Sequence, residues 1–110
     1  MLAVRARGRR RRGGVMREVT HGDIRAAARV LLGHPDACWP EVMAEMLSEA
    51  HQADCYRKAR GRHHPQLGNG TLMSAALARA PAPAPAPGEG AHLAALGAAI
   101  EAVLDWRAQR

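Results

Sequence analysis

Four prolines alternate with alanine from Pro81 to Pro87, and this repeat divides the chain. Proline has no backbone N–H and a fixed φ, so alternating proline prevents a helix and favours polyproline II. At ~3.1 Å per residue the repeat predicts a semi-rigid spacer of roughly 20 Å. We therefore expect a helical core over residues 16–80, a Pro/Ala/Gly linker over 81–90 and a C-terminal helix over 91–110.

Apolar residues recur every three or four positions in the core, so we expect an all-α fold, a small bundle of three helices. The first helix begins at Thr20, whose hydroxyl can cap it with Asp23 three residues later. Gly33 and Pro35 end this helix. Its apolar stripe consists of Ile24, Ala27, Ala28 and Leu31.

The second predicted helix starts at Pro40, since proline is favoured at the first helical position, and ends at Gly61. Its inward stripe is Met43, Met46, Leu47, Ala50 and Ala53. The third helix is short and is capped by Thr71 or Asn69. Its residues expected to face inward are Leu72, Met73, Ala76 and Leu77.

Beyond the linker, residues 91–107 predict a C-terminal amphipathic helix with a narrow apolar stripe. A narrow stripe is typical of a coiled-coil or partner-docking face, although folding back on the chain's own core is an equal alternative. The candidate partner-binding residues are Leu93, Leu96, Ile100, Val103 and Leu104.

The formal charge of +6 is concentrated at the start of the chain. Six arginines and no acid lie in residues 1–15, whereas the sequence from Met16 onward is formally neutral. The first 15 residues are either a disordered arm that attracts phosphates non-specifically or a leader that is not translated. The high isoelectric point alone is therefore no argument for DNA binding.

A chain of 110 residues with no Phe and many alanines has a thin core, which favours homo-oligomerisation. No apolar stretch suits a secretory signal or a membrane span. Cys38 and Cys55 show no paired spacing, so reduced thiols in a cytoplasmic protein are expected.

Metal and catalytic patterns are weak. His51, Cys55, His63 and His64 lie near one another in sequence, but no second ligand pair completes a zinc spacing. Cys55 and His51 have nucleophile–base spacing without an orienting third group. We expect no enzyme activity, no metal and no cofactor.

The turn at residues 68–71 could hold a phosphate at a helix N-terminus, but Gly, Asn and a capping Thr explain it more simply. Next to it lies a basic cluster that can meet a phosphate backbone. The candidate DNA-binding residues are Arg57, Lys58, Arg60 and Arg62, with His63 and His64 nearby. A helix-turn-helix fits poorly, so contact with double-stranded DNA would be weak, salt-sensitive and sequence-tolerant.

Residues 21–77 resemble a family of short helical proteins of gene transfer agents, the small terminase subunits encoded beside the large terminase. The most specific part of the resemblance is Tyr56 and Arg57, Gly61 and Arg62, His64 and Pro65, Gly68 to Gly70, and Leu72 and Met73. The resemblance implies a phage-like, non-catalytic adaptor that oligomerises, engages DNA and recruits the large terminase ATPase-nuclease. It does not cover residues 1–15 or the linker.

Two other classes stay open. One is a small helical protein–protein interaction or regulatory module without DNA contact. The other is a small enzyme that uses Cys55 or a metal. The sequence departs from the small-terminase pattern in lacking a helix-turn-helix, which puts site-specific recognition of a packaging start in doubt, although a packager of unselected DNA would not need that motif.

Overall fold

Helices account for all the regular secondary structure in the described residues, as the sequence predicts. The computed structural model describes residues 18–79, 81–83 and 88–109. The predicted basic arm at residues 1–15 and the prolines at 85 and 87 lie outside these ranges. In chain order the elements are α1 (His21–Leu31), a 3₁₀ turn η2 (Asp36–Cys38), α2 (Trp39–Arg60), α3 (Leu72–Leu77) and α4 (Gly90–Ala108).

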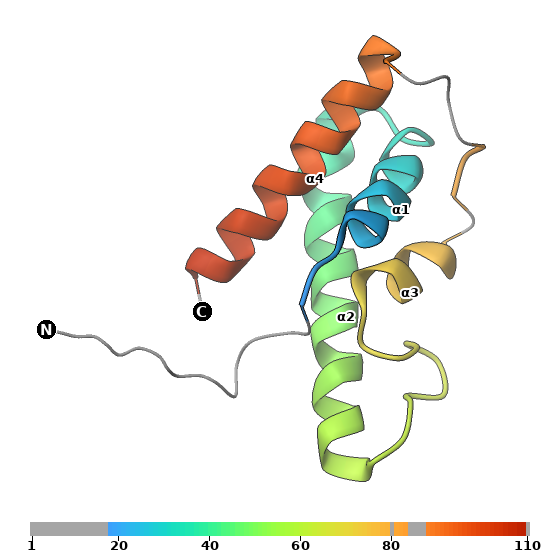
Figure 1. Cartoon of the computed structure of the whole chain (residues 1–110), viewed down its shortest axis with the longest axis vertical. Coiled ribbons are helices and arrows are strands. Elements are labelled where there is room, and N and C mark those ends of the chain that lie inside the picture. Colours follow the sequence, from blue (N-terminus) through green and yellow to red (C-terminus); the bar gives the residue numbers. More distant parts are fainter. Residues whose placement is uncertain (1–17, 80, 84–87, 110) are drawn as a thin grey trace, which may run out of the picture.

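Helix α1 lies at the centre and touches α2, α3 and α4 (Figure 1). Three consecutive alanines, Ala26 to Ala28, are buried on it, so the neighbouring helices can approach closely. The larger buried side chains come from the ends of α1 and α3 and from the middle of α2: Leu31, Met43, Met46, Leu47 and Leu72. The predicted stripe of α2 is confirmed as its core face.

Both ends of α1 are closed by side chains. At its start the Thr20 hydroxyl caps the helix as predicted, and the Asp23 side chain completes a capping box with it. Asp23 is 3% exposed and also accepts a 2.8 Å hydrogen bond from the backbone N–H of Met73 in α3, which joins the two helices. At its end the indole Nε1 of Trp39 donates to the carbonyl oxygen of Leu31 at 2.7 Å.

The short helix α3 is capped by the Thr71 hydroxyl, one of the two predicted caps. Leu72 and Ala76 face inward as expected, but Leu77 is 56% exposed, so its inward placement was wrong. The helix ends at Leu77, and no further helical turn or neighbouring element covers this last residue. Arg79, just beyond, pairs with Glu45 and Glu49 of α2.

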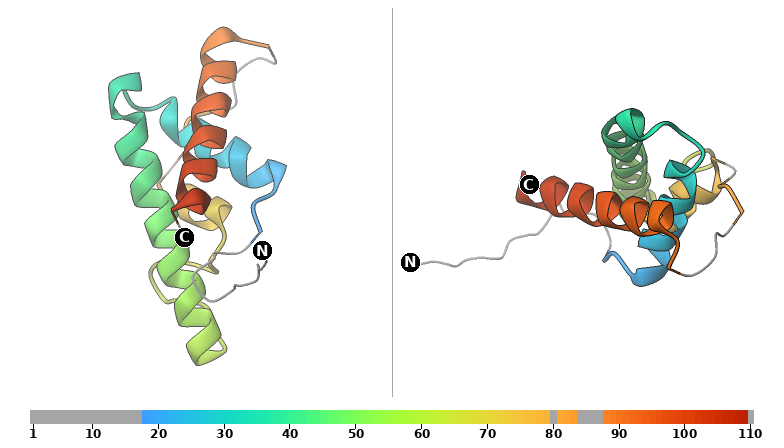
Figure 2. Two further views of the ribbon diagram at one scale, coloured as in Figure 1. Left: turned by 90° about the vertical axis from the view of Figure 1, so that its left-hand side faces the viewer. Right: turned by 90° about the horizontal axis from the view of Figure 1, so that it is seen from above.

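Helix α4 packs back on the body, which decides between the two alternatives for its inner face. It contacts α1 and α2 through Ala95, Ala99 and Val103, and it runs beside α2 and crosses α1 (Figure 2). The linker is tied to α1 by paired bonds, in which Arg29 Nε donates to the Ala82 oxygen and Ala82 N–H donates to the Arg29 oxygen. The C-terminal helix therefore completes the core.

Candidate functional site

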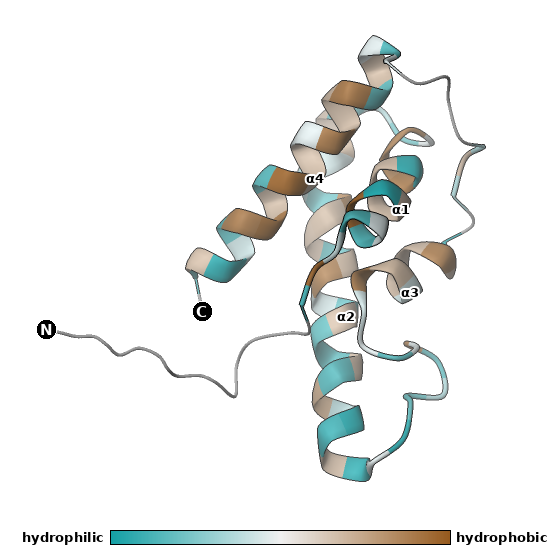
Figure 3. Ribbon diagram, in the orientation of Figure 1, coloured by the Kyte–Doolittle hydropathy of each residue, from teal (hydrophilic) through white to brown (hydrophobic). Residues whose placement is uncertain are grey.

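The last turns of α2 and the turn that follows form a hydrophilic projection, here called the basic tip. Figure 3 shows this end of α2 as strongly hydrophilic, at one extremity of the long axis of the molecule. Gly61 ends α2 in a left-handed conformation, with φ of +72°, and turns the chain back toward α3. The basic tip contains the four predicted DNA-binding residues, Arg57, Lys58, Arg60 and Arg62, together with His63.

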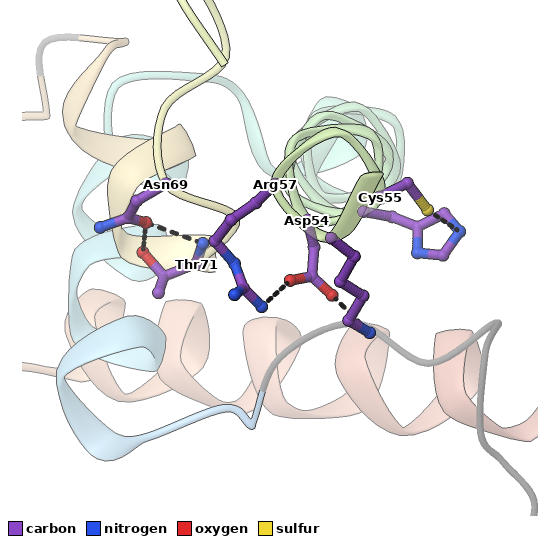
Figure 4. Close-up of polar contacts among 7 residues, drawn as sticks. Asp54, Cys55, Arg57, Asn69 and Thr71 are labelled. Atoms are coloured by element: carbon purple, nitrogen blue, oxygen red, sulfur yellow. Dashed lines mark hydrogen bonds and ion pairs between the residues drawn. The ribbon is translucent and has the colours of Figure 1, made fainter. Parts of the chain in front are cut away.

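Two of the four cations are held by a carboxylate of the same helix. Asp54 is 1% exposed and lies 2.7 Å from Arg57 Nη2 and 3.1 Å from Lys58 Nζ (Figure 4). A buried carboxylate needs such partners because desolvation without them is costly. Arg57 and Lys58 are 33% and 50% exposed, so they keep part of their surface for solvent.

Arg60 and Arg62 point their charge to the surface. Both are exposed, and neither has an ion-pair partner among the residues the structure describes. The Arg60 guanidinium lies over the Tyr56 ring, 5.4 Å from its centroid, which limits the freedom of that side chain. Since the four cations outnumber the single carboxylate, the basic tip keeps a positive field.

A hollow of about 440 Å³ opens in the basic tip between Arg57, Gly61, Arg62 and His63. The Nε atom of Arg57 is buried and has no hydrogen-bond partner in the described part of the chain, whereas the Arg62 side chain is exposed to solvent. Guanidinium N–H groups are suited to planar contacts with phosphate oxygens. The lining can therefore hold an anion such as a backbone phosphate.

The neighbouring turn confirms the simpler interpretation of Gly68 to Thr71. Gly68 and Gly70 have φ of +91° and +95°, and Asn69 Oδ1 accepts from both the N–H and the hydroxyl of Thr71 (Figure 4). The first-turn amides of α3 are also occupied, since Ser74 N–H donates to Thr71 Oγ1 and Met73 N–H donates to Asp23 Oδ1. These groups stabilise the turn and are not free for a phosphate.

The histidines and Cys55 do not form a metal site in the described residues, where no group of three potential ligands comes together. His64 is a turn residue, because its Nδ1 accepts the backbone N–H groups of Gln66 and Leu67, each at 3.0 Å. Cys55 Sγ lies 3.7 Å from His51 Nε2, and His51 packs edge-on to the Trp106 ring. No carboxylate orients this pair in the described part of the chain.

The five predicted partner-binding residues separate into two groups on α4. Val103 is 5% exposed and belongs to the core, and Leu96 is partly buried against it. Leu93, Ile100 and Leu104 are 55%, 47% and 60% exposed. These three exposed residues are called the outer face of α4, and Figure 3 shows the hydrophobic bands along this helix.

An apolar groove of about 440 Å³ runs between α1 and α4 and adjoins the outer face. Val19, Ile24, Leu96, Ile100 and Leu104 supply apolar lining. The titratable residues among its lining are all basic: His21, Arg25, His92 and Arg107. This α1/α4 groove therefore combines apolar walls with a positive rim.

The matched family model covers residues 17–103, from the start of the described body through most of α4. The chain belongs to this family, a domain of unknown function (DUF7742). Because the match spans the helical core and the linker and ends at Val103, the DUF7742 domain includes most of the C-terminal helix. No curated protein and no solved structure matches the chain.

Sequence reasoning missed two features of the DUF7742 domain. The spacing of Asp54 and Lys58, i and i+4, could have revealed the ion pair, but nothing in the sequence marks that aspartate as buried. The basic rim was missed because Arg25 and Arg107 are 82 positions apart, and only the packing of α4 on α1 brings them to one groove.

None of the helices in the described ranges is long and apolar enough to cross a membrane.

Proposed function

We propose that this protein is a non-catalytic DNA-packaging adaptor of the small terminase type. In this role it binds double-stranded DNA through the basic tip and binds protein through α4, to other copies of itself or to the large terminase subunit. The observation that carries the proposal is the pair Arg60 and Arg62, which are exposed and have no carboxylate partner in the described residues. The residues that carry the resemblance lie on and beside the same tip.

The electrostatics favour a weak, sequence-tolerant contact. Phosphate contacts position a protein on DNA, whereas base contacts specify sequence. Arg60 and Arg62 lie at the end of a helix and in a turn, and earlier turns of α2 expose the acids Glu41 and Glu45, which the DNA backbone would repel. A packager of unselected DNA needs only this kind of contact. Such an adaptor acts in the cytoplasm, where DNA is packaged into particles.

Binding of the full chain to two unrelated labelled duplexes tests the DNA contact. Replacing Arg60 and Arg62 together by alanine should reduce the slope of log K against log salt by about two, since each phosphate contact contributes ~0.9. Both duplexes should be affected alike. Because residues 1–15 are the same in every variant, the difference reports on the basic tip.

The lysine variants Arg60→Lys and Arg62→Lys are the matched control. They keep the charge and should keep the salt slope, because a phosphate accepts a point charge. Equal binding by the alanine variant and the unchanged protein would remove the DNA contact from the proposal. Far-UV circular dichroism checks that each variant is folded.

Recruitment is tested by co-purification with the protein encoded immediately downstream. We expect that neighbour to be a large protein with a phosphate-binding Gly-x4-Gly-Lys-[Ser/Thr] loop and a carboxylate-rich nuclease half. Its capture should survive the Arg60 and Arg62 substitutions. An unrelated neighbour that is not captured would contradict the packaging role.

A second function, a protein interaction module without DNA contact, is favoured by one observation. Asp54 holds both Arg57 and Lys58, so half of the basic cluster is already paired within the chain. In that case the alanine variants at Arg60 and Arg62 would leave function intact, and substitutions on the outer face of α4 would abolish it.

A further inference from the structure

The two flanks of α4 carry opposite charge. At 3.6 residues per turn, Glu101 and Asp105 each lie about 160° around the helix from Val103, which is buried and lines the α1/α4 groove. These two exposed acids, here called the acidic edge, are absent from the lining of that groove. The exposed Leu93 and Leu104 lie on the side of α4 that turns from the groove toward the acidic edge, and Leu104 also lines the groove.

The charges on both flanks lack ion-pair partners within the described residues. Glu101 and Asp105 make no salt bridge there, and neither do Arg25 and Arg107 on the rim of the groove. The same molecule thus exposes a basic apolar groove and, on the other side of an apolar stripe, an acidic edge. These surfaces are complementary to each other, yet one copy cannot join them because they lie on opposite flanks of a single helix.

We propose that the α1/α4 groove binds α4 of a second copy of this chain, so that the acidic edge of one copy faces Arg25 and Arg107 of the next. Apolar contact by Leu93, Ile100 and Leu104 supplies the burial. The charges set the orientation, since like charges brought together at an interface are strongly disfavoured.

The charge pattern also restricts the symmetry. An antiparallel two-fold pair of α4 helices places identical flanks on the same side, so acid would meet acid and base would meet base. A parallel pair or a head-to-tail arrangement places the acidic edge against the basic rim. Head-to-tail contacts close into rings when the rotation permits. Association through α4 needs no DNA contact, so it can hold or fail separately from DNA binding by the basic tip.

Glycine at position 97 suits this docking. It lies on the exposed side of α4 between Leu93 and Ile100, and a Cβ built there would meet nothing within 4 Å of its own chain. Glycine inside a helix costs about 1 kcal/mol relative to alanine. Packing within one copy therefore does not explain the glycine at this position, whereas a neighbouring helix can approach α4 closely at Gly97.

Sedimentation velocity on the full chain, from about 1 to about 100 µM, is the direct test. The unchanged protein should associate reversibly. The groove variant Arg25→Glu with Arg107→Glu, and the edge variant Glu101→Arg with Asp105→Arg, should each raise the dissociation constant more than about tenfold. All four positions are exposed and unpaired in the described chain, so both variants should fold.

Mixing the two variants gives the decisive result. The groove variant presents acids on both flanks and the edge variant presents bases on both, so an equimolar mixture should associate although each alone does not. Association of the variants alone that matches the unchanged protein, or a mixture that stays monomeric, would overturn the proposal. The proposal would also be overturned if the unchanged protein stayed monomeric over the whole concentration range, whether or not it binds the large terminase subunit.

A matched pair of leucine substitutions tests the apolar contact of α4. Leu104→Asp, on the stripe, should abolish association, whereas Leu77→Asp, an equally exposed leucine on α3 outside the groove, should leave it unchanged. The opposite pattern would place the interface on α3 and refute the assignment to α4.

Discussion

Replacing Gly70 by alanine should destabilise the fold more than a turn glycine normally would. Gly70 has a φ of +95°, where a side chain costs roughly 1–2 kcal/mol. In addition, a Cβ there would lie 2.9 Å from Asp54 Cα and 3.0 Å from its Cβ. These atoms belong to α2 and cannot rotate away, so overpacking adds about 1–3 kcal/mol. The expected total is about 2–5 kcal/mol.

Gly61→Ala is the control that separates the two contributions. Gly61 has a φ of +72°, but a Cβ there would meet nothing within 4 Å, so only the conformational cost of about 1–2 kcal/mol applies. Urea unfolding followed by far-UV circular dichroism gives both free energies. At about 4–8 °C per kcal/mol for a domain of this size, Gly70→Ala should lower Tm by at least roughly 8 °C. Equal losses for the two variants would refute the close approach of the turn to α2.

Three further substitutions test the packing. Asp23→Ala should cost about 2–4 kcal/mol in urea unfolding, because it leaves the backbone N–H groups of Thr20 and Met73 without their acceptor. Gly97→Ala should raise the free energy of unfolding by about 0.5–1 kcal/mol in a dilute, dissociated sample, and no change would mean that the helix is already restrained there. Trp39→Phe should cost about 1–2 kcal/mol through the lost indole hydrogen bond and should free the end of α1, a change that amide hydrogen exchange in its last turn would detect.

Helices α1 and α2 were predictable because each carries both a periodic stripe and end signals. Thr20 with Asp23 fixed the start of α1, and Gly61 fixed the end of α2, as the structure confirms. The 3₁₀ turn at residues 36–38 was not predicted, since three residues offer no periodicity. Leu77 was misplaced for a related reason: six helical residues define a face poorly, and the chain leaves the helix directly after it.

The apolar residues of α4 show what hydrophobic periodicity can predict and what it cannot. Its sequence predicts apolar residues at spacings of three and four, and such a stripe was expected to be one face. In the structure the small residues Ala95 and Ala99 pack inward with Val103, and the larger Leu93 and Leu104 stay outside. A hydrophobicity pattern ranks leucine above alanine, so it does not show that a crowded core admits the small side chains and leaves the larger ones on the surface.

The sequence predicts the cluster of four cations in the basic tip, but it does not show which of them are paired with a carboxylate in the fold. Counting charges along residues 57–62 gives four cations, whereas the fold pairs Asp54 with two of them. That aspartate is 1% exposed, and the backbone of Gly70 packs against its Cα and Cβ. The approach requires a residue without a side chain, so the glycine that shapes the turn also packs against α2 at the residue that carries the carboxylate. The packing of the turn and the position of the aspartate that pairs with Arg57 and Lys58 therefore depend on the same contact.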